Sequence, residues 1–250
     1  MALKKNSIKR YGLVGKNIDY SFSRGYFSQK FKEENLNDCS YENFDLPSID
    51  LLPSVLATEN ISGLNVTIPY KREVIPFLDQ LSEASQEMQA VNTIRFEKNG
   101  SISGHNTDVY GFEKSLNELS DRLPNKALIL GTGGASSAVA YVLKKLNIDH
   151  LFVSRNPKIN QINYKDIDPS VLKEYKLIIN ASPLGTFPKV ELSPDLPYQA
   201  LDDNHVLFDL IYNPLETLFL QEGKKRGAII SNGLKMLEYQ AEKSWEIWNQ

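Results

Sequence analysis

The chain has 250 residues, with 28 basic and 31 acidic side chains, a net charge of −3 and 41% hydrophobic residues. These proportions are those of a folded globular protein, and they exclude a disordered, collagen-like or low-complexity chain. The length allows one large or two modest domains, either of which buries enough surface to fold without disulfides. The pI near 5.7 argues against nucleic acid as a partner.

The composition also predicts a cytoplasmic protein. Cys39 is the only cysteine, so neither an internal disulfide nor a thiolate metal site can form. No apolar signal-peptide core follows the polar N-terminus, and no stretch approaches the roughly 18 apolar residues that a membrane span needs. We therefore expect no membrane partner.

Short β-branched runs alternate with helical patterns along the chain, which is typical of an α/β protein with mainly parallel sheets. A turn at Lys98-Asn99-Gly100 predicts a hairpin. In the first half we expect strands at residues 10–14, 63–68, 91–96 and 101–104, and helices at 24–34, 70–81 and 110–123.

A new series of elements begins near residue 125. We expect strands at 127–130, 151–154, 177–180, 206–210 and 228–231, and helices at 136–146 and 236–248. Five strands in succession predict a doubly wound, Rossmann-like sheet that binds ligands at the carboxyl ends of its strands. The predicted organisation is a first α/β domain at 1–108, a Rossmann-like domain at 109–232, and a terminal helix within 233–250 that returns to the first domain, with the active-site cleft between the domains.

A glycine-rich turn stands between the first strand and first helix of this second series. It reads Gly131-Thr132-Gly133-Gly134-Ala135-Ser136. Gly131 permits a tight turn, Gly133 lets the backbone approach a pyrophosphate, and the free N–H groups at the helix start bind negative charge. The third position of the G-x-G-x-x-G pattern is Ser136 instead of glycine, but the strand–turn–helix context still predicts a dinucleotide site.

The end of the next strand indicates which dinucleotide binds. An NAD site has an acidic residue there for the ribose 2′-hydroxyl, whereas a 2′-phosphate needs a cation. This strand ends in Ser154-Arg155-Asn156-Pro157-Lys158, without a carboxylate. Arg155 can bind phosphate through its two-pronged guanidinium, and Lys158 can add a point charge. The sequence therefore predicts NADP(H).

In the first half, Lys71 stands where a strand turns a corner. The run from Asn65 to Lys71 alternates polar and apolar residues, and Pro69 should end the strand and hold Lys71 at a rigid turn. A lysine held in this way can present its ammonium group to a substrate oxygen. Asp108, at the start of the next helix, is either a second functional group or only a helix cap.

Six motifs together resemble the shikimate dehydrogenase family in order and spacing. They are N-V-T-I-P-Y-K, A-V-N-T, N-T-D, G-T-G-G-A-S, I-I-N-A-S-P-L-G and N-G-L-K-M-L-E-Y-Q, and they cover nearly the whole chain. The resemblance implies reversible, metal-independent reduction of 3-dehydroshikimate to shikimate with NADPH, in aromatic amino-acid biosynthesis. It makes 1–108 the substrate-binding and catalytic domain and 109–232 the NADP-binding domain, in a monomer or homodimer.

The resemblance also implies roles for individual residues. Lys71 matches the catalytic lysine and Asp108 its partner. The serines at 21 and 23 match the pair that binds the substrate carboxylate, and the residues at 92 and 240 match those that bind its ring hydroxyls. The substrate-binding residues implied are Ser21, Ser23, Thr67, Asn92, Tyr212 and Gln240.

On the cofactor side, the resemblance implies that the glycine-rich turn holds the pyrophosphate. Ser154 and Arg155 match residues at the adenosine phosphate, and Leu210 and Gly233 match residues near the nicotinamide. Glu83 falls where some family members contact the cofactor. The cofactor-binding residues implied are Gly131, Thr132, Gly133, Gly134, Ala135, Ser136, Ser154, Arg155, Leu210 and Gly233.

The chain departs from the family pattern at three places near these residues, one of which is Gln89 in place of the usual glycine before A-V-N. Arg24 follows Ser23 where a proline-containing helix start is common, so it could alter substrate selectivity. Asn156 stands where threonine often follows the arginine. His105, His150 and His205 are too widely spaced for a zinc motif, and we expect no metal.

Three alternatives remain open. A quinate/shikimate dehydrogenase shares these motifs but often prefers NAD. A nucleotide-binding sensor could keep the fold without turnover, although Lys71 and Asp108 are both present. A methylenetetrahydrofolate dehydrogenase-like enzyme has a similar two-domain plan.

Overall fold

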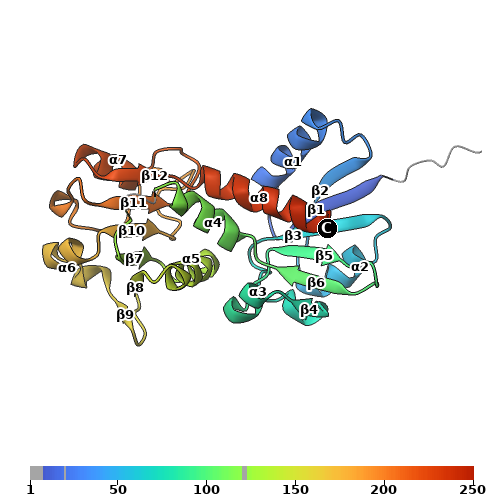
Figure 1. Cartoon of the computed structure of the whole chain (residues 1–250), viewed down its shortest axis with the longest axis horizontal. Helices are drawn as coiled ribbons and strands as arrows, with labels where there is room; N and C mark the ends of the chain where they lie inside the picture. Colours follow the sequence, from blue (N-terminus) through green and yellow to red (C-terminus); the bar gives the residue numbers. More distant parts are fainter. Residues whose placement is uncertain (1–7, 20, 120–122) are drawn as a thin grey trace, which may run out of the picture. The chain divides into compact units, whose positions relative to one another are not determined.

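The computed structural model describes residues 8–19, 21–119 and 123–250, and its fold is α/β, as predicted (Figure 1). The chain forms two compact units, each with its own sheet. The first unit is Met1–Thr107 together with Ala241–Gln250, and the second is Asp108–Gln240. The helix α8 (Leu234–Trp248) therefore contributes residues to both units.

The first unit contains a six-stranded sheet with the order β2-β1-β3-β5-β6-β4. β2, β1 and β3 are parallel, β3, β5 and β6 are antiparallel neighbours, and β4 is parallel to β6. The predicted hairpin joins β5 to β6, and Gly100 in its turn has a φ of 87°. The strands are β1 (Lys9–Gly15), β2 (Cys39–Asp45), β3 (Ile61–Val66), β4 (Gln80–Leu81), β5 (Thr93–Phe96) and β6 (Ile102–His105).

Successive residues of a strand point to opposite sides of the sheet. Both sides of this sheet carry apolar side chains, and helices cover both. The helices are α1 (Phe22–Glu33), α2 (Leu52–Leu56) and α3 (Glu83–Met88), with short 3₁₀ helices η1 (Ile49–Leu51) and η2 (Ile75–Phe77). One face of β1 and β3 packs with α2. The other face packs with α1 and the end of α8 in an aromatic cluster of Tyr11, Phe27, Phe31, Tyr41, Trp245 and Trp248.

The helix predicted over residues 70–81 is wrong. Residues 68–74 form turns, followed by η2 and β4. Pro76 lacks the N–H that an α-helix needs and restricts the backbone of Ile75 before it. The apolar spacing of Val74 and Leu78 therefore cannot continue as a helix.

The second unit contains a fully parallel sheet with the order β12-β11-β10-β7-β8-β9. This is a doubly wound order, in which the chain reverses its direction of winding between β7 and β10. The strands are β7 (Lys126–Leu130), β8 (Asp149–Val153), β9 (Gln161–Ile162), β10 (Leu177–Asn180), β11 (Val206–Asp209) and β12 (Ile229–Ser231).

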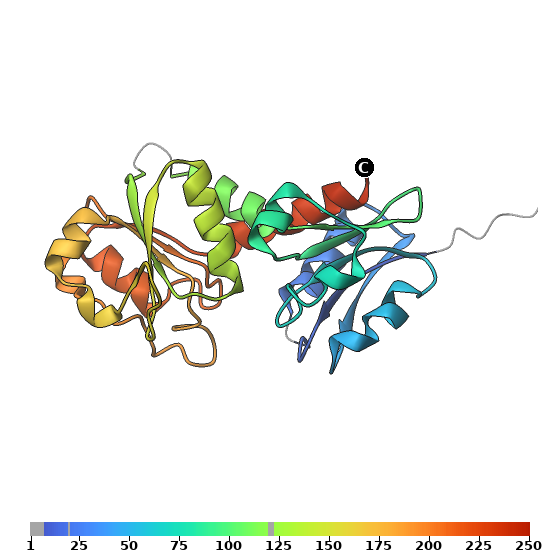
Figure 2. The ribbon, with the colours of Figure 1, turned by 90° about the horizontal axis from the view of Figure 1, so that it is seen from below.

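Figure 2 shows this second sheet with α5 on one face and α6 and α7 on the other. Leu128 and Leu130 of β7 pack in the cluster that includes Leu172 of α6 and Phe219 of α7. The helices of this unit, besides its part of α8, are α4 (Asp108–Asn117), α5 (Gly134–Lys145), α6 (Pro169–Glu174) and α7 (Leu218–Lys225), with η4 (Tyr164–Asp166) and η5 (Tyr198–Ala200). α4 is shorter than the predicted helix over 110–123, and residues 120–122 lie outside the described residues.

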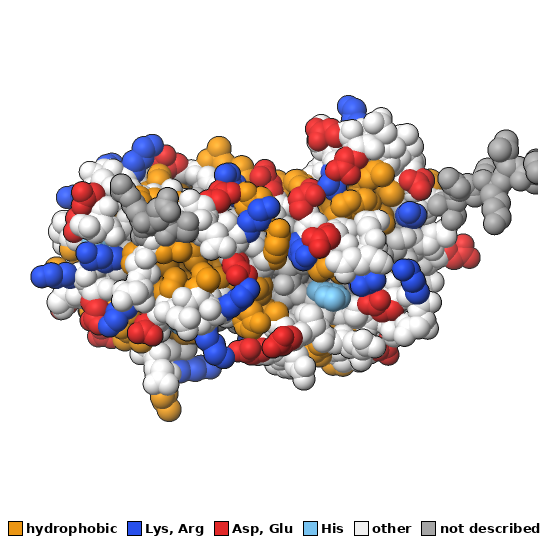
Figure 3. Space-filling view, viewed as in Figure 1, with side chains coloured by type: hydrophobic (Ala, Val, Ile, Leu, Met, Phe, Trp, Pro, Cys, Tyr) orange, Lys and Arg blue, Asp and Glu red, His pale blue; other side chains and the backbone are white. Residues whose placement is uncertain are grey.

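The surface carries mixed charge. On the face shown in Figure 3, lysine and arginine side chains are interspersed with acidic ones. Within the described ranges, every helix falls short of the length and hydropathy that crossing a membrane requires.

Candidate active site

Lys71 lies in the turn after β3, and its backbone is fixed by two neighbours. The Val91 N–H donates to the Lys71 carbonyl oxygen at 2.7 Å. The adjacent Tyr70 is 3% exposed, and its hydroxyl donates to the Leu46 carbonyl oxygen at 2.6 Å. The Lys71 side chain is half-buried, so a constrained turn presents its ammonium group.

Thr67 and Asn92 lie at the same edge of the first sheet, where β1 and β3 end. The Thr67 N–H donates to the Val14 carbonyl oxygen at 2.9 Å, and the Val66 N–H donates to the Asn92 carbonyl oxygen at 2.8 Å. Asn92 is 3% exposed and directly precedes β5. Strand pairing therefore brings these two predicted substrate-binding residues to one edge.

Ser21 and Ser23 form the N-terminus of α1. Ser21 is the N-cap, and its hydroxyl oxygen accepts a hydrogen bond from the Ser23 N–H at 3.2 Å. Ser23 is buried, whereas Arg24 in the first turn is exposed. A helix N-terminus with two hydroxyls favours an anion such as a carboxylate.

Asp108 and Gln240 belong to the second unit and lie on helices that pack closely. Asp108 begins α4 and is 9% exposed, and Gln240 on α8 is 8% exposed. A Cβ at Gly111 would lie 2.4 Å from the Met236 carbonyl oxygen, so only glycine permits this approach of α4 to α8. The Gln240 Nε2 donates to the Leu237 carbonyl oxygen at 2.9 Å.

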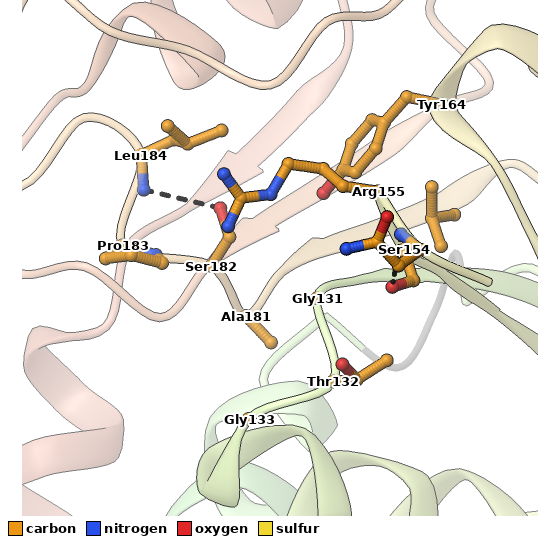
Figure 4. A pocket seen from close by; sticks show the side chains of 12 residues that line it. Gly131, Thr132, Gly133, Ser154, Arg155, Tyr164, Ala181, Ser182, Pro183 and Leu184 are labelled. Carbon is orange, nitrogen blue, oxygen red and sulfur yellow. Dashed lines mark hydrogen bonds between the residues drawn. The ribbon is translucent and has the colours of Figure 1, made fainter. Parts of the chain in front are cut away.

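A pocket of about 550 Å³ lies at the carboxyl ends of β7, β8 and β10 in the second unit (Figure 4). This is the edge of a doubly wound sheet at which ligands bind. The residues that line it are Gly131, Thr132, Gly133, Val153, Ser154, Arg155, Asn156, Tyr164, Ala181, Ser182, Pro183 and Leu184. The pocket therefore contains five of the ten predicted cofactor-binding residues.

The glycine-rich turn forms one wall of this pocket. Gly131 has a φ of 109°, a conformation that favours glycine. A Cβ at Gly133 or Gly134 would meet nothing within 4 Å, so a ligand can reach the backbone there. The Ser136 hydroxyl donates to the Gly133 carbonyl oxygen at 2.6 Å and the residue is 2% exposed. Serine at the third position therefore turns inward and leaves the N-terminus of α5 open to a phosphate.

Arg155 is exposed and extends in Figure 4 from the end of β8 toward Ser182. Its carbonyl oxygen accepts from Asn163 Nδ2 at 3.0 Å, which holds the loop. Burial raises the pKa of Tyr164, and the nearby Arg155 opposes that rise. Among the described residues that line the pocket none is acidic, so the site fits a 2′-phosphate better than a free 2′-hydroxyl.

The sequence predicted no role for Tyr164 or for the segment Ser182–Leu184. The segment belongs to the motif I-I-N-A-S-P-L-G, and its position after a buried strand was a usable signal. Ser182 Oγ donates to Asn180 Oδ1 at 2.6 Å and accepts from the Leu184 N–H at 3.3 Å. Tyr164 follows β9, a short strand that the sequence did not predict.

Other residues singled out in the sequence lie elsewhere. Lys158 is exposed, and its N–H donates to Gln161 Oε1 at 3.1 Å; it is not among the residues that line the pocket. Glu83 is exposed at the start of α3. Burial lowers the pKa of His105, whose Nε2 lies 3.0 Å from Ser103 Oγ.

Leu210, Tyr212 and Gly233 lie in and beside the loop after β11. The Gly233 N–H donates to the Ile211 carbonyl oxygen at 3.0 Å. A Cβ at Gly233 would lie 2.1 Å from the Leu210 carbonyl oxygen. The structure thus brings Leu210 and Gly233 into contact, and Tyr212 is half-buried in the same loop.

Asp209 holds this loop from inside the second unit and was not predicted. Its Oδ1 accepts from the Ile211 N–H at 3.0 Å and from Asn180 Nδ2 at 3.1 Å, and its Oδ2 accepts from the Thr217 hydroxyl at 2.6 Å. Burial raises the pKa of Asp209 to about 6, although these three donors act to lower it. The carboxylate therefore ionises at a cost to the folded state.

This cost predicts a pH dependence of stability. The pKa of Asp209 is about 6 in the folded state, above its ordinary value of 3.8. The protonated carboxyl therefore stabilises the folded protein fully below about pH 3.8, and this stabilisation is lost as pH rises through about 6. Relative to Asp209→Asn, the unsubstituted protein should lose roughly 2 kcal/mol of unfolding free energy between about pH 4.5 and about pH 7.5. Urea unfolding of both proteins measures this; parallel pH profiles would contradict it.

Comparison with known proteins identifies the family. A model described as the shikimate dehydrogenase substrate binding domain matches residues 13–94. A shikimate dehydrogenase (NADP⁺) of Methanococcus maripaludis is 38% identical over 258 residues, covering 96% of this chain and 91% of that protein. The chain belongs to the shikimate dehydrogenase family. A shikimate dehydrogenase (NADP⁺) of Pelagibacter ubique is 36% identical and covers 97% of this chain and 94% of its own length.

A solved shikimate dehydrogenase structure agrees with this assignment. The enzyme from Thermus thermophilus, in complex with NADP(H) and shikimate, is 30% identical with a TM-score of 0.83, covering 96% of this chain and 93% of that one. The family's substrate-binding model spans Ser21, Ser23, Thr67, Lys71 and Asn92. Thr67 and Asn92, at the edge of the first sheet, therefore fall within the residues that this model matches.

Proposed function

We propose that this protein is an NADP-dependent shikimate dehydrogenase, which reversibly reduces 3-dehydroshikimate to shikimate with NADPH. Most of the proposed substrate-binding residues belong to the first unit, and the proposed cofactor-binding residues belong to the second. The observation that carries the proposal is the half-buried Lys71 on a constrained turn, with Thr67 and Asn92 at the carboxyl edge of the same sheet. Full-length similarity to NADP⁺-dependent family members supports the choice of substrate and cofactor.

The substrate is a ring that carries a carboxylate and several hydroxyls, and the polar groups fit these functions. Ser21 and Ser23 at the α1 N-terminus bind the carboxylate, with Thr67 and Tyr212 assisting. Asn92 and Gln240 bind ring hydroxyls. Together these contacts orient the ring so that one carbonyl faces the reacting groups.

Lys71 is the proposed general acid. Reduction breaks the carbonyl π bond, and the oxygen gains negative charge as the carbon gains a hydride. The Lys71 ammonium transfers its proton to that oxygen, which completes the hydroxyl, and the neutral amine regains a proton from water. Asp108 accepts a hydrogen bond from a substrate hydroxyl and so helps to hold the ring in position.

The second unit supplies the cofactor site. The open glycine-rich turn and the α5 N-terminus hold the pyrophosphate, and Ser154 and Arg155 hold the 2′-phosphate. Leu210 and Gly233 contact one another and form the surface against which we propose that the nicotinamide ring packs. When bound, NADPH supplies the hydride.

Arg155→Ala should raise KM for NADP⁺ by about 10- to 100-fold, because a hydrogen-bonded charge pair with the 2′-phosphate is lost. KM for NAD⁺, which lacks that phosphate, should stay within about twofold by the same reasoning. Steady-state kinetics with each cofactor measures the two KM values. Arg226→Ala, an exposed arginine at the end of α7, is the control. An equal change for both cofactors would remove Arg155 from phosphate binding.

The proposed function is tested by absorbance at 340 nm with shikimate or quinate and NADP⁺ or NAD⁺, in all four combinations. We expect the highest kcat/KM for shikimate with NADP⁺. Preference for quinate with NAD⁺ would assign the chain to the quinate/shikimate dehydrogenases. Cofactor binding without turnover in any combination would indicate the sensor alternative.

We propose that this enzyme acts in the cytoplasm as a monomer or homodimer, with small molecules as ligands and no nucleic acid or membrane partner. A single cysteine, a net charge of −3 and the interspersed charges on the face shown in Figure 3 support this. Light scattering distinguishes the two oligomeric states.

A further inference from the structure

Six polar side chains lie buried together in the first unit, in what we call the Asn65 network. Four come from β2, β3, β5 and α8. The other two lie directly before β5 and directly before α4. Each of the six is between 0% and 7% exposed: Tyr41, Asn65, Asn92, Thr93, Thr107 and Ser244. Burying so many polar groups is costly unless they bond to one another, so their bonding pattern is informative.

Asn65 is at the centre of the network, and its amide orientation is set by its partners. The Tyr41 hydroxyl donates to Asn65 Oδ1 at 2.8 Å. On the other side, Asn65 Nδ2 donates to Ser244 Oγ at 2.9 Å. The Ser244 Oγ in turn lies 2.8 Å from Thr93 Oγ1 and 3.2 Å from Thr107 Oγ1. Ser244 thus joins α8 to the strands that carry the other members.

The network ends on one oxygen of Asn92, a proposed substrate-binding residue. Asn92 Oδ1 accepts from the Thr107 N–H at 2.7 Å, from Thr93 Oγ1 at 3.1 Å and from Thr107 Oγ1 at 3.2 Å. A backbone N–H can only donate, so the Asn92 atom that faces it must be the carbonyl oxygen. The Asn92 Nδ2 therefore lies on the other side of the carboxamide, away from the Thr93 and Thr107 side chains.

The donors run in one direction through the network. Ser244 Oγ accepts from Asn65 Nδ2, so the Ser244 hydrogen can serve Thr93 Oγ1. The Thr93 hydrogen then serves Asn92 Oδ1. Such a chain of donors polarises each successive bond in the same sense and strengthens it. This chain of donors ends on Asn92 Oδ1.

The far end of the network lies beside Ser23, the proposed carboxylate-binding serine. Burial raises the pKa of Tyr41, and the Ser23 side chain opposes that rise, which places the two side chains next to one another. The Asn65 network thus extends from the neighbourhood of one substrate-binding side chain to another.

We propose that Asn65, Thr93 and Ser244 are positioning residues that fix the Asn92 amide with its Nδ2 toward the substrate, as an obligatory donor to a ring hydroxyl oxygen. This inference rests on the proposed function, in which Asn92 binds shikimate. A network kept only for stability could be replaced by apolar groups of similar shape at little cost. A positioning network has to affect shikimate binding selectively.

The test is the affinity for shikimate, measured by calorimetry without cofactor, together with KM for NADP⁺ and the melting temperature. Ser244→Ala should weaken shikimate binding by about 3- to 10-fold, the loss expected when one hydrogen bond no longer orients Asn92. KM for NADP⁺ should not change. Ser85→Ala is the matched control, because Ser85 is also 0% exposed in the first unit but bonds to Ser82 Oγ at 3.0 Å, outside the network.

A second pair of variants separates positioning from folding. Thr93→Val removes the hydroxyl at nearly constant shape and should weaken shikimate binding by a similar factor, whereas Thr93→Ser keeps the hydroxyl and should restore it. The positioning inference would be overturned if the unsubstituted protein binds shikimate and both Ser244→Ala and Thr93→Val bind it equally well. The proposed function would then still stand. No shikimate binding by the unsubstituted protein would overturn the proposed function and this inference together.

Discussion

Replacing Lys71 with alanine should lower kcat for shikimate oxidation by about 10²- to 10⁴-fold, which is the usual contribution of a positioned general acid or base. KM for shikimate should remain within about threefold, because the proton transfer develops only in the transition state. KM for NADP⁺ should not change, since the glycine-rich turn and Arg155 that hold the cofactor belong to the second unit. Steady-state kinetics with both substrates varied measures all three constants.

Arg72→Ala is the matched control for this variant. Arg72 is the next residue and also carries a positive charge, but it is exposed. Its loss should change kcat by less than about twofold, as is usual for an exposed surface charge. If Lys71→Ala kept a near-normal kcat while its melting temperature matched that of the unsubstituted protein, Lys71 would not be the acid.

The second large effect concerns folding. Trp248→Ala should lower the free energy of unfolding of the first unit by about 3–5 kcal/mol, the range for removing a buried tryptophan. Trp248 is 8% exposed, its ring centroid lies 5.0 Å from that of Tyr11, and its Nε1 donates to the Ile94 carbonyl oxygen at 3.0 Å. A Cβ at Gly63 would lie 2.3 Å from the Trp248 ring, so the ring packs directly against β3 at this glycine.

Urea unfolding followed by far-UV circular dichroism measures this loss. Glu246→Ala, an exposed position on the same helix, should change the unfolding free energy by no more than about 0.5 kcal/mol. Trp248→Phe keeps an aromatic ring in contact with Tyr11 but loses the N–H donor, so its cost should fall between the two. A Trp248→Ala midpoint equal to that of Glu246→Ala would show that α8 does not stabilise the first unit.

Much of the fold was predictable because its buried strands are short apolar runs. β10 was predicted with its observed ends, and the other strands of the predicted series were found within a few residues. β2 was missed, since Cys39–Asp45 contains mostly polar residues and only Tyr41 is buried. The false helix over 70–81 arose from apolar spacing that Pro76 interrupts. Local pattern therefore indicated buried elements well and solvent-facing elements poorly.

The candidate site was predictable to the extent that it lies in contiguous motifs. The glycine-rich turn and Arg155 line the predicted pocket. Tyr164 reaches that pocket from a separate segment after β9, which no local motif marks. The Asn65 network could not be predicted either, since its members meet only through strand pairing and the return of α8. Amide orientations depend on such tertiary partners, so sequence alone does not determine them.

The proposed reaction moves a hydride from a carbon of shikimate to NADP⁺. The most direct measurement uses shikimate with deuterium on the carbon that bears the 3-hydroxyl, followed by mass spectrometry of the reduced cofactor and of the organic product. We expect 3-dehydroshikimate, and NADPH that has gained one deuterium atom from each substrate molecule oxidised. Reduced cofactor without deuterium, or no reduced cofactor from a folded protein that binds both ligands, would contradict it.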